Sequence, residues 1–271
     1  MKNNMISKYK SFLSHQNLAE NTIRSYVWTV RYFLKMYGTV SKKHLLEDKG
    51  YMVENHNPHT VNQRLQAMNK YLDFIGKGDL KLRSVKLQQK NFLENVISDA
   101  DYRFLKNRLK EDGQRSWYFV VWFLAATGAR VSELLQIKAE HVRQGYLDLY
   151  SKGGKHRRLY IPKTLHDESL EWLTERGIVS GYIFLNRFGK RITARGIAQQ
   201  LKLYAERYGL NTAVVYPHSF RHRFAKNFLD RFNDLALLAD LMGHESIETT
   251  RIYLRRTSTE QQAIVDRVVD W

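Results

Sequence analysis

The chain has 271 residues, 43% of them hydrophobic, so it is long enough for two domains and apolar enough to bury their cores. The net charge of +17 favours a polyanionic partner such as DNA, RNA or an anionic membrane surface. No apolar run could span a bilayer and the first ten residues lack a signal-peptide core, so we expect a cytoplasmic protein without a membrane partner. Cysteine is absent, which excludes disulfides, thiolate metal sites and cysteine nucleophiles.

The first 80 residues have the spacing of a small helical bundle. Between Asn21 and Tyr37 the apolar residues recur along one helical face, and a second stripe of this kind runs from Pro58 to Ile75. Shorter helices are expected near 5–14 and 41–46. These stripes predict an N-terminal helical domain over residues 1–80.

Residues 81–97 interrupt this periodicity. The segment is polar and basic, and we interpret it as a linker between domains. Ser98 then begins a capping box with Asp101, which indicates the start of a helix. A second domain is therefore expected over residues 98–271.

The second domain shows mainly helical spacing. The segment Trp117–Ala126 is almost wholly apolar and predicts a buried helix. Alternating residues at 146–150 and 158–161 predict two strands, and the Gly-Gly turn between them indicates a β-hairpin. Helices are expected over residues 131–136, 164–175, 193–208, 218–230, 235–242, 246–256 and 259–269. The predicted fold class is mainly α with a small antiparallel β-sheet.

Four short segments of this domain place reactive polar residues on otherwise apolar elements. They are ATGARVSELL, SKGGK, PHSFRHRFA and LMGHESIETTRIYL, and they contain Arg130, Lys152, His218 with Arg221, and His244 with Tyr253. Two arginines could neutralise a phosphodiester, and histidines could donate hydrogen bonds or move protons near neutral pH. A tyrosine could then attack the phosphorus if cationic groups or a base activated it. Taken singly, each residue has an ordinary structural explanation as a cap, an ion pair or a packed side chain, so the ordered set carries the argument.

These segments resemble the signature motifs of the tyrosine recombinase, or phage integrase, family, and most closely its short Xer-type members. The family pattern Arg, Lys, His-x-x-Arg, His/Trp, Tyr is matched in order by Arg130, Lys152, His218, Arg221, His244 and Tyr253. The NTIRSY and TVNQRL segments resemble the family's helical core-binding domain, a SAM-like bundle. The resemblance therefore covers nearly the whole chain.

The resemblance implies a role for each matched residue. Tyr253 would form a 3′-phosphotyrosyl link. The transition state would be stabilised by Arg130, Arg221 and His244. Protons would be moved by His218 and Lys152. Lys155 lies in the same hairpin tip and competes with Lys152 for the role of general acid. Glu133 is expected to support the site by holding the Arg130 helix or His218. His222 follows Arg221 directly and is expected to point away from the site.

The resemblance also implies contacts with double-stranded DNA outside the catalytic residues. Candidate DNA-binding residues are Thr22, Arg24, Arg64, Lys155 and Arg157. No metal and no nucleotide cofactor is expected, because the phosphotyrosine conserves the bond energy. Nucleoid association follows from the DNA partner.

The last helix carries an apolar stripe of Ile264, Val265, Val268 and Trp271. It could pack on its own domain, but we favour docking on a neighbouring protomer, because a terminal tryptophan on a short helix needs a pocket. The resemblance implies a homotetramer on two DNA sites that exchanges strands through a Holliday junction. A monomer without DNA, and a partner recombinase or activator, stay open.

Two other functions remain as alternatives. A type IB topoisomerase uses nearly the same residues to relax DNA, and a non-catalytic DNA-binding protein could keep the fold. The docking helix and the complete residue set argue for a recombinase instead, either a Xer-like resolvase or a small recombinase of a mobile element.

Overall fold

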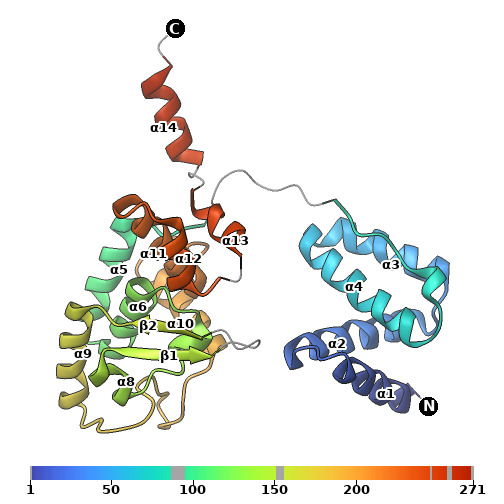
Figure 1. Cartoon of the computed structure of the whole chain (residues 1–271), viewed down its shortest axis with the longest axis horizontal. Coiled ribbons are helices and arrows are strands. Elements are labelled where there is room, and N and C mark those ends of the chain that lie inside the picture. The colour runs from blue at the N-terminus through green and yellow to red at the C-terminus, as the bar shows by residue number, and fades with distance from the viewer. Residues whose placement is uncertain (1, 87–94, 151–155, 245, 255–257, 270–271) are drawn as a thin grey trace. The chain divides into compact units, whose positions relative to one another are not determined.

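Figure 1 shows the computed structural model of the chain, which describes residues 2–86, 95–150, 156–244, 246–254 and 258–269. Its internal contacts divide the chain into two compact units, residues 1–89 and 90–271. None of the helices in the described ranges is long and apolar enough to cross a membrane.

The first unit is a bundle of four helices. These are α1 (Lys2–His15), α2 (Glu20–Tyr37), α3 (Lys42–Asn55) and α4 (Pro58–Phe74), followed by the short 3-10 helix η1 (Gly78–Leu80). The stripes of α2 and α4 face each other and bury residues such as Val30, Phe33 and Leu72. Helix α3 is much longer than the expected 41–46 segment. Its start is fixed by Ser41, whose side chain accepts from the backbone N–H of His44.

Both ends of the expected linker 81–97 belong to the units. At the first end, Leu82 is 9% exposed, and its N–H and C=O are bound at 3.0 and 2.9 Å by the amide side chain of Asn69. At the second end, Ile97 is 2% exposed and its N–H donates to Ser219 Oγ at 2.8 Å. Within the expected linker, residues 87–94 lie outside the described residues.

The second unit is built around the buried helix α6. Its elements are α5 (Asp99–Glu111), α6 (Arg115–Thr127), α7 (Val131–Leu134), α8 (Ala139–Gln144), β1 (Tyr146–Tyr150), β2 (His156–Tyr160), α9 (Lys163–Glu175), α10 (Ala194–Arg207), α11 (Pro217–Arg231), α12 (Leu235–Met242), α13 (Ile247–Arg251), the 3-10 helix η2 (Ile252–Leu254) and α14 (Ser258–Val268). Helix α6 contacts α5, α9 and α11 and lies in the middle of the unit (Figure 1). The expected fold class, mainly helical with a small antiparallel sheet, is confirmed.

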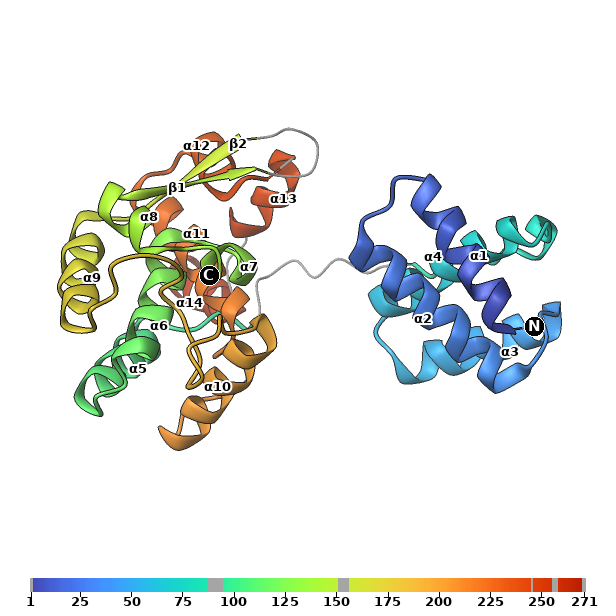
Figure 2. The ribbon, with the colours of Figure 1, turned by 90° about the horizontal axis from the view of Figure 1, so that it is seen from below.

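The two strands form one antiparallel hairpin, in which Leu149 pairs with Arg157 and Leu147 with Leu159. Because side chains alternate along a strand, these four residues share the inner face of the hairpin. Strand β2 begins at His156, two residues before the expected start, and contacts α12 (Figure 2). This contact brings the hairpin to the carboxyl end of α12.

The C-terminal elements differ from the single helix expected over residues 246–256. Helix α13 ends at Arg251, and Tyr253 lies in the 3-10 turn η2, which packs on α11. In α14, two residues of the expected stripe are solvent-exposed, Val265 at 50% and Val268 at 55%, and Ile264 is half-buried. Trp271 lies outside the described residues.

Candidate active site

Arg130 reaches the site because α6 ends in a sharp turn. Gly128 adopts a left-handed conformation with a φ of 63°, and a Cβ at this position would lie 2.5 Å from Cδ1 of Phe224. Only glycine therefore fits the turn. Arg130 follows in extended backbone as the N-cap of α7, and its side chain is 42% exposed.

Arg221 on α11 is the most deeply buried cation of the site, with 1% of its surface exposed. Its guanidinium donates to the C=O of Gly128 at 2.6 Å and to that of Met242 at 2.8 Å, so it joins the end of α6 to the end of α12. Nη2 also lies 3.0 Å from Nε2 of His244. Because a guanidinium only donates, this His244 nitrogen accepts, and its Nδ1–H donates to Thr250 Oγ1 at 2.7 Å.

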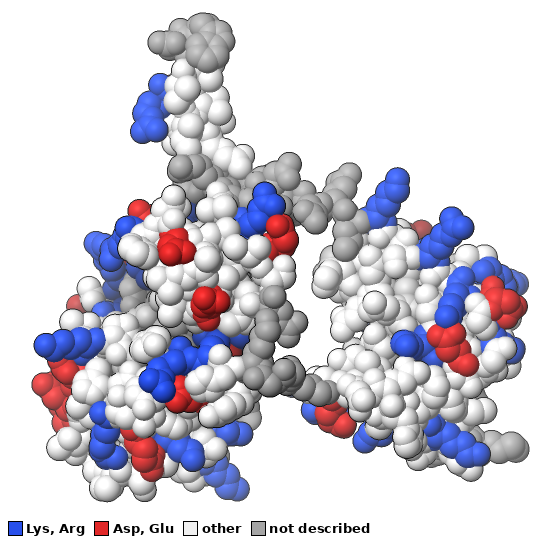
Figure 3. Space-filling view, viewed as in Figure 1, with Lys and Arg blue, Asp and Glu red and all other residues white. Residues whose placement is uncertain are grey.

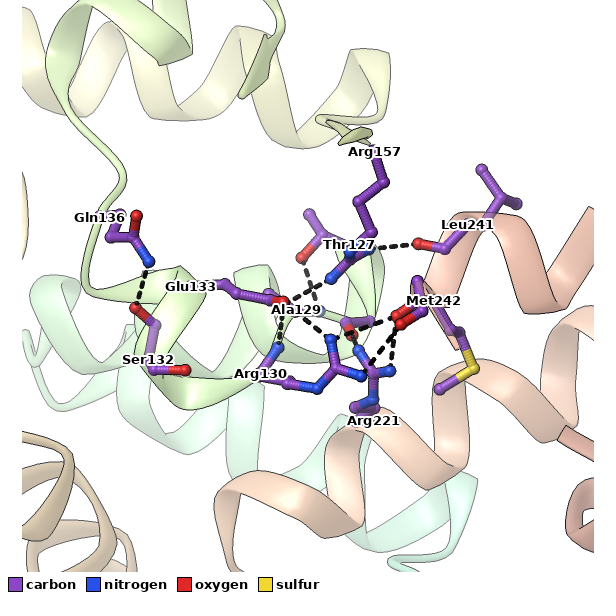
Figure 4. Close-up of polar contacts among 12 residues, drawn as sticks. Thr127, Ala129, Arg130, Ser132, Glu133, Gln136, Arg157, Arg221, Leu241 and Met242 are labelled. Carbon is purple, nitrogen blue, oxygen red and sulfur yellow. Dashed lines mark hydrogen bonds and ion pairs between the residues drawn. The ribbon is translucent and has the colours of Figure 1, made fainter. Parts of the chain in front are cut away.

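Three arginines from three elements bind the last carbonyls of α12 (Figure 4). Arg157 donates to Leu241, Arg221 to Met242 at 2.8 Å, and Arg130 to Met242 at 3.4 Å and Gly243 at 3.3 Å. These carbonyls have no partner within the helix and form its negative pole. The carboxyl end of α12 therefore holds the three cations together.

Glu133 is the counter-charge of this cluster and is only 9% exposed. Its carboxylate accepts from the backbone N–H of Arg130 at 2.7 Å and from the Arg130 side chain at 2.9 Å, and it pairs with Arg157 at 2.5 Å. Burial alone would raise the pKa of Glu133, but the charge and hydrogen bonds of Arg157 and those of Arg130 outweigh it and lower the pKa. Glu133 thus stays ionised and holds both arginines.

The histidines of the site are kept neutral. Burial, followed by the positive charges of Arg221, Arg130 and Arg157, lowers the pKa of His244 to about 4. Burial, Arg221 and Arg130 likewise lower the pKa of His218. These histidines can therefore offer one donor and one acceptor each at neutral pH.

Tyr253 lies at the same place and is 5% exposed. Its ring is stacked near His244, with 6.2 Å between the centroids. Burial raises the pKa of the Tyr253 hydroxyl, while the charge and hydrogen bonding of Arg221 and the charge of Arg130 oppose this rise. The structure therefore brings Tyr253, Arg221, Arg130 and His244 together.

His222 is placed differently from the expectation. Its Nδ1 lies 3.2 Å from the hydroxyl of Tyr253, so it points into the site and not away from it. His218 instead contacts His222 edge to face, at 4.3 Å between ring centroids. The two histidines are four residues apart on α11 and hence share one helical face, a spacing that already indicated this position for His222.

Arg157, one of the expected DNA-binding residues, is a central member of the arginine cluster. Its side chain is 11% exposed and points from the inner face of β2 to Glu133 and Leu241. The inward orientation of Arg157 could be predicted from strand alternation, because Arg157 is two residues from the buried Leu159. Lys152 and Lys155, the two candidates for the general acid, lie outside the described residues.

The other expected DNA-binding residues lie in the first unit. Thr22 and Arg24 are on α2, and the Arg24 guanidinium donates to Asn21 at 2.7 Å. Arg64 on α4 is half-buried, contacts His56 Nε2 at 3.0 Å and lies over the exposed ring of Trp28 at 5.2 Å. Figure 3 shows Lys and Arg on the visible face of each unit.

An open cleft of about 810 Å³ reaches the arginine cluster from the hairpin side. Its lining includes Arg130, Arg157, Arg158 and His244, together with the aromatic Tyr150. Such a cationic cleft suits a phosphodiester strand. Across the ranges that the structure describes, no group of three or more His, Cys, Asp or Glu side chains could hold a metal ion.

Comparison with known proteins places this chain in a family. The model of the phage integrase family matches residues 96–260, so the chain belongs to that family. It is a tyrosine recombinase, an enzyme of site-specific DNA recombination. This confirms the expected enzyme class, and the topoisomerase alternative is not favoured.

The relatives and solved structures agree with this placement. Tyrosine recombinase XerA of Pyrococcus furiosus is 29% identical, over 98% of this chain and 94% of the relative. The TnP I resolvase of Bacillus thuringiensis is 26% identical, over 91% of this chain and 93% of the relative. Among solved structures, the Tn1549 transposon integrase with circular intermediate DNA has a TM-score of 0.73 at 15% identity, covering 98% of this chain and 99% of that one. XerH bound to difH has a TM-score of 0.68 at 23% identity, covering 89% of this chain and 78% of that one.

Proposed function

We propose that the chain cuts and rejoins DNA strands by attack of Tyr253 on a phosphodiester. The bond from Tyr253 Oη to phosphorus forms, the bond from phosphorus to O5′ breaks, and a 3′-phosphotyrosyl link and a free 5′-hydroxyl result. The observation that carries this proposal is the convergence of Arg130, Arg221 and His244 on Tyr253. Fixed donors of this kind stabilise a phosphorane-like transition state by roughly 3–4 kcal/mol each.

The remaining residues have supporting roles in this proposal. Glu133 orients Arg130, as its two hydrogen bonds to that residue suggest. A lysine of the hairpin tip, Lys152 or Lys155, protonates the leaving O5′. A histidine of α11 takes the proton of Tyr253, and the family pattern assigns this step to His218.

DNA recognition involves both units in this proposal. The first unit grips the duplex through Thr22, Arg24 and Arg64, and the second through its cationic cleft. Contacts from Lys and Arg to phosphates position a protein on DNA and make its affinity salt-dependent. An enzyme with this substrate works in the cytoplasm, at the nucleoid.

We further propose that four protomers act on two DNA sites and exchange strands through a Holliday junction. The exposed apolar residues Val265 and Val268 of α14 support this assembly, because exposed apolar surface is typical of a protein-protein contact site. Repeated head-to-tail docking closes a ring. Such an enzyme would serve as a resolvase or as the recombinase of a mobile element.

A covalent-adduct assay tests the proposed function. The protein is incubated with a duplex selected for binding from random sequences and nicked near the cleavage position, and the products are separated on a denaturing gel. A protein–DNA adduct that Tyr253→Phe abolishes is expected. An adduct formed by Tyr253→Phe would refute the nucleophile, supercoil relaxation without recombinants would support a topoisomerase, and binding without an adduct would support a non-catalytic protein.

A further inference from the structure

The surroundings of the Tyr253 hydroxyl include a group that can accept its proton. His222 Nδ1 lies 3.2 Å from the hydroxyl oxygen. The positive charge of Arg221 acts on the same hydroxyl, but a guanidinium can only donate and therefore cannot accept the proton of Tyr253. Nδ1 of His222 can accept this proton in the tautomer in which His222 carries its own proton on Nε2.

His222 is in the protonation state that this hydrogen bond needs. Burial, followed by His218, Arg221 and His244, lowers the pKa of His222 to about 4. A neutral imidazole can accept a proton, whereas an imidazolium cannot. His222 is therefore neutral at pH 7, and its Nδ1 lies within hydrogen-bonding distance of the Tyr253 hydroxyl.

We propose that His222 accepts the proton of Tyr253 during strand cleavage, an inference that rests on the proposed role of Tyr253 as nucleophile. As the bond from Oη to phosphorus forms and the bond from phosphorus to O5′ breaks, the proton of Oη passes to His222 Nδ1. The hairpin lysine supplies a separate proton to O5′. When the strand is rejoined, Nδ1 returns its proton to Tyr253, so protons balance over the cycle.

In this arrangement His218 has a role other than accepting the proton of Tyr253. Its ring contacts His222 edge to face at 4.3 Å, one helical turn before it. A neutral His218 is then free to donate to the phosphate, and it fixes the His222 ring. Removing His218 should slow cleavage without changing which group takes the proton.

The pH dependence of cleavage distinguishes these roles. Single-turnover adduct formation on the nicked duplex is measured from pH 6 to 9 for wild type, His222→Ala and His218→Ala. The wild-type rate should be nearly independent of pH. His222→Ala should be about 100-fold slower at pH 7 and should rise about tenfold per pH unit, because attack then depends on the tyrosinate population. His218→Ala should be slower at all pH values but keep the flat profile.

A second variant separates proton transfer from positioning. His222→Gln keeps a hydrogen-bond acceptor but cannot take a proton, so it should show the same rising profile as His222→Ala. A fluorinated tyrosine of lower pKa at position 253 should partly restore the rate of both variants at pH 7. Retained duplex binding in a gel-shift assay checks that the variants are folded.

Several results would overturn the inference. A wild-type rate in His222→Gln would reduce His222 to a positioning residue, and a flat profile in both His222 variants would refute proton transfer. A rising profile in His218→Ala alone would assign the proton to His218. Absence of an adduct in the wild-type protein would instead refute the proposed function itself.

Discussion

Arg157 of β2 and Glu133 of α7 form an ion pair of 2.5 Å in which both side chains are nearly buried. The pair joins strand β2 to α7, the helix whose N-cap is Arg130. Since Arg157 also donates to Leu241, one side chain connects three elements of the site. Arg157 is therefore expected to position the cluster.

Arg157→Gln should lower the free energy of unfolding by about 2 kcal/mol, because Glu133 loses a charged hydrogen-bond partner while it stays buried. The cleavage rate should fall more than duplex affinity does. Arg158→Gln is the matched control, since Arg158 pairs with Asp148 on the outer face of the same strand and should change stability by less than about 0.5 kcal/mol. Urea unfolding measures the stability of both variants. Equal losses of stability in the two variants would contradict the positioning role of Arg157.

Gly243→Ala tests the fit between Arg157 and the end of α12. Gly243 has a φ of +62°, and a Cβ there would lie 2.6 Å from Arg157 Nε. We expect the free energy of unfolding to fall by about 2 kcal/mol, and roughly half of this loss to come from the strain of alanine in a left-handed backbone conformation. In an Arg157→Ala background only the backbone part should remain, which a double-mutant cycle measures. Additive losses would show that the two residues do not interact.

Stability should fall with acid in two stages. The unfolded chain protonates its histidines near pH 6.5, but folded His222 and His244 resist protonation until about pH 4. The unfolded state thus binds more protons in this range, so stability decreases as pH falls from 6.5 to 4. Folding lowers the pKa of Glu133, so protonation of this carboxylate adds a further loss of stability below its usual pKa near 4.5. Urea unfolding of His222→Gln/His244→Gln should show a flatter slope above pH 4, and an unchanged slope would contradict the buried neutral histidines.

DNA affinity should depend on Arg24 more than on Arg108. Arg24 is bound to the neutral Asn21, whereas Arg108 pairs with Glu111 at 3.1 Å and Asp112 at 3.6 Å. Arg24→Gln should weaken duplex binding and reduce the slope of log K against log salt by about 1. Arg108→Gln should leave both unchanged. Fluorescence anisotropy at several salt concentrations measures the slopes, and equal effects would contradict a phosphate contact at Arg24.

Assembly should depend on the apolar face of α14. Val265→Asp places a charge on that face, whereas Ala263→Asp places the same charge on the other side of the helix. The first variant should bind a single site normally but lose cooperative assembly on paired sites. The second should assemble as wild type. Analytical ultracentrifugation with DNA measures this, and assembly by Val265→Asp would contradict docking through α14.

Much of the fold could be predicted because periodicity is local. The stripes of α2 and α4, the apolar α6 and the Gly-Gly hairpin signal are each contained in a few neighbouring residues. Helix α8 was not predicted, since Ala139–Gln144 is too short to show a period. The split of the 246–256 segment at Arg251 was also missed, because packing of η2 on α11 decides it.

The sequence by itself determined which residue types form the site and their order along the chain. It could not determine their partners, because each arginine reaches carbonyls far away in sequence, as Arg221 does at Gly128 and Met242. Tertiary structure alone decided that Arg157 binds Glu133 and that His222 contacts Tyr253. The physical reason is that spacing fixes the face on which a side chain lies, whereas the packing of α11, α12 and the hairpin fixes what that face meets.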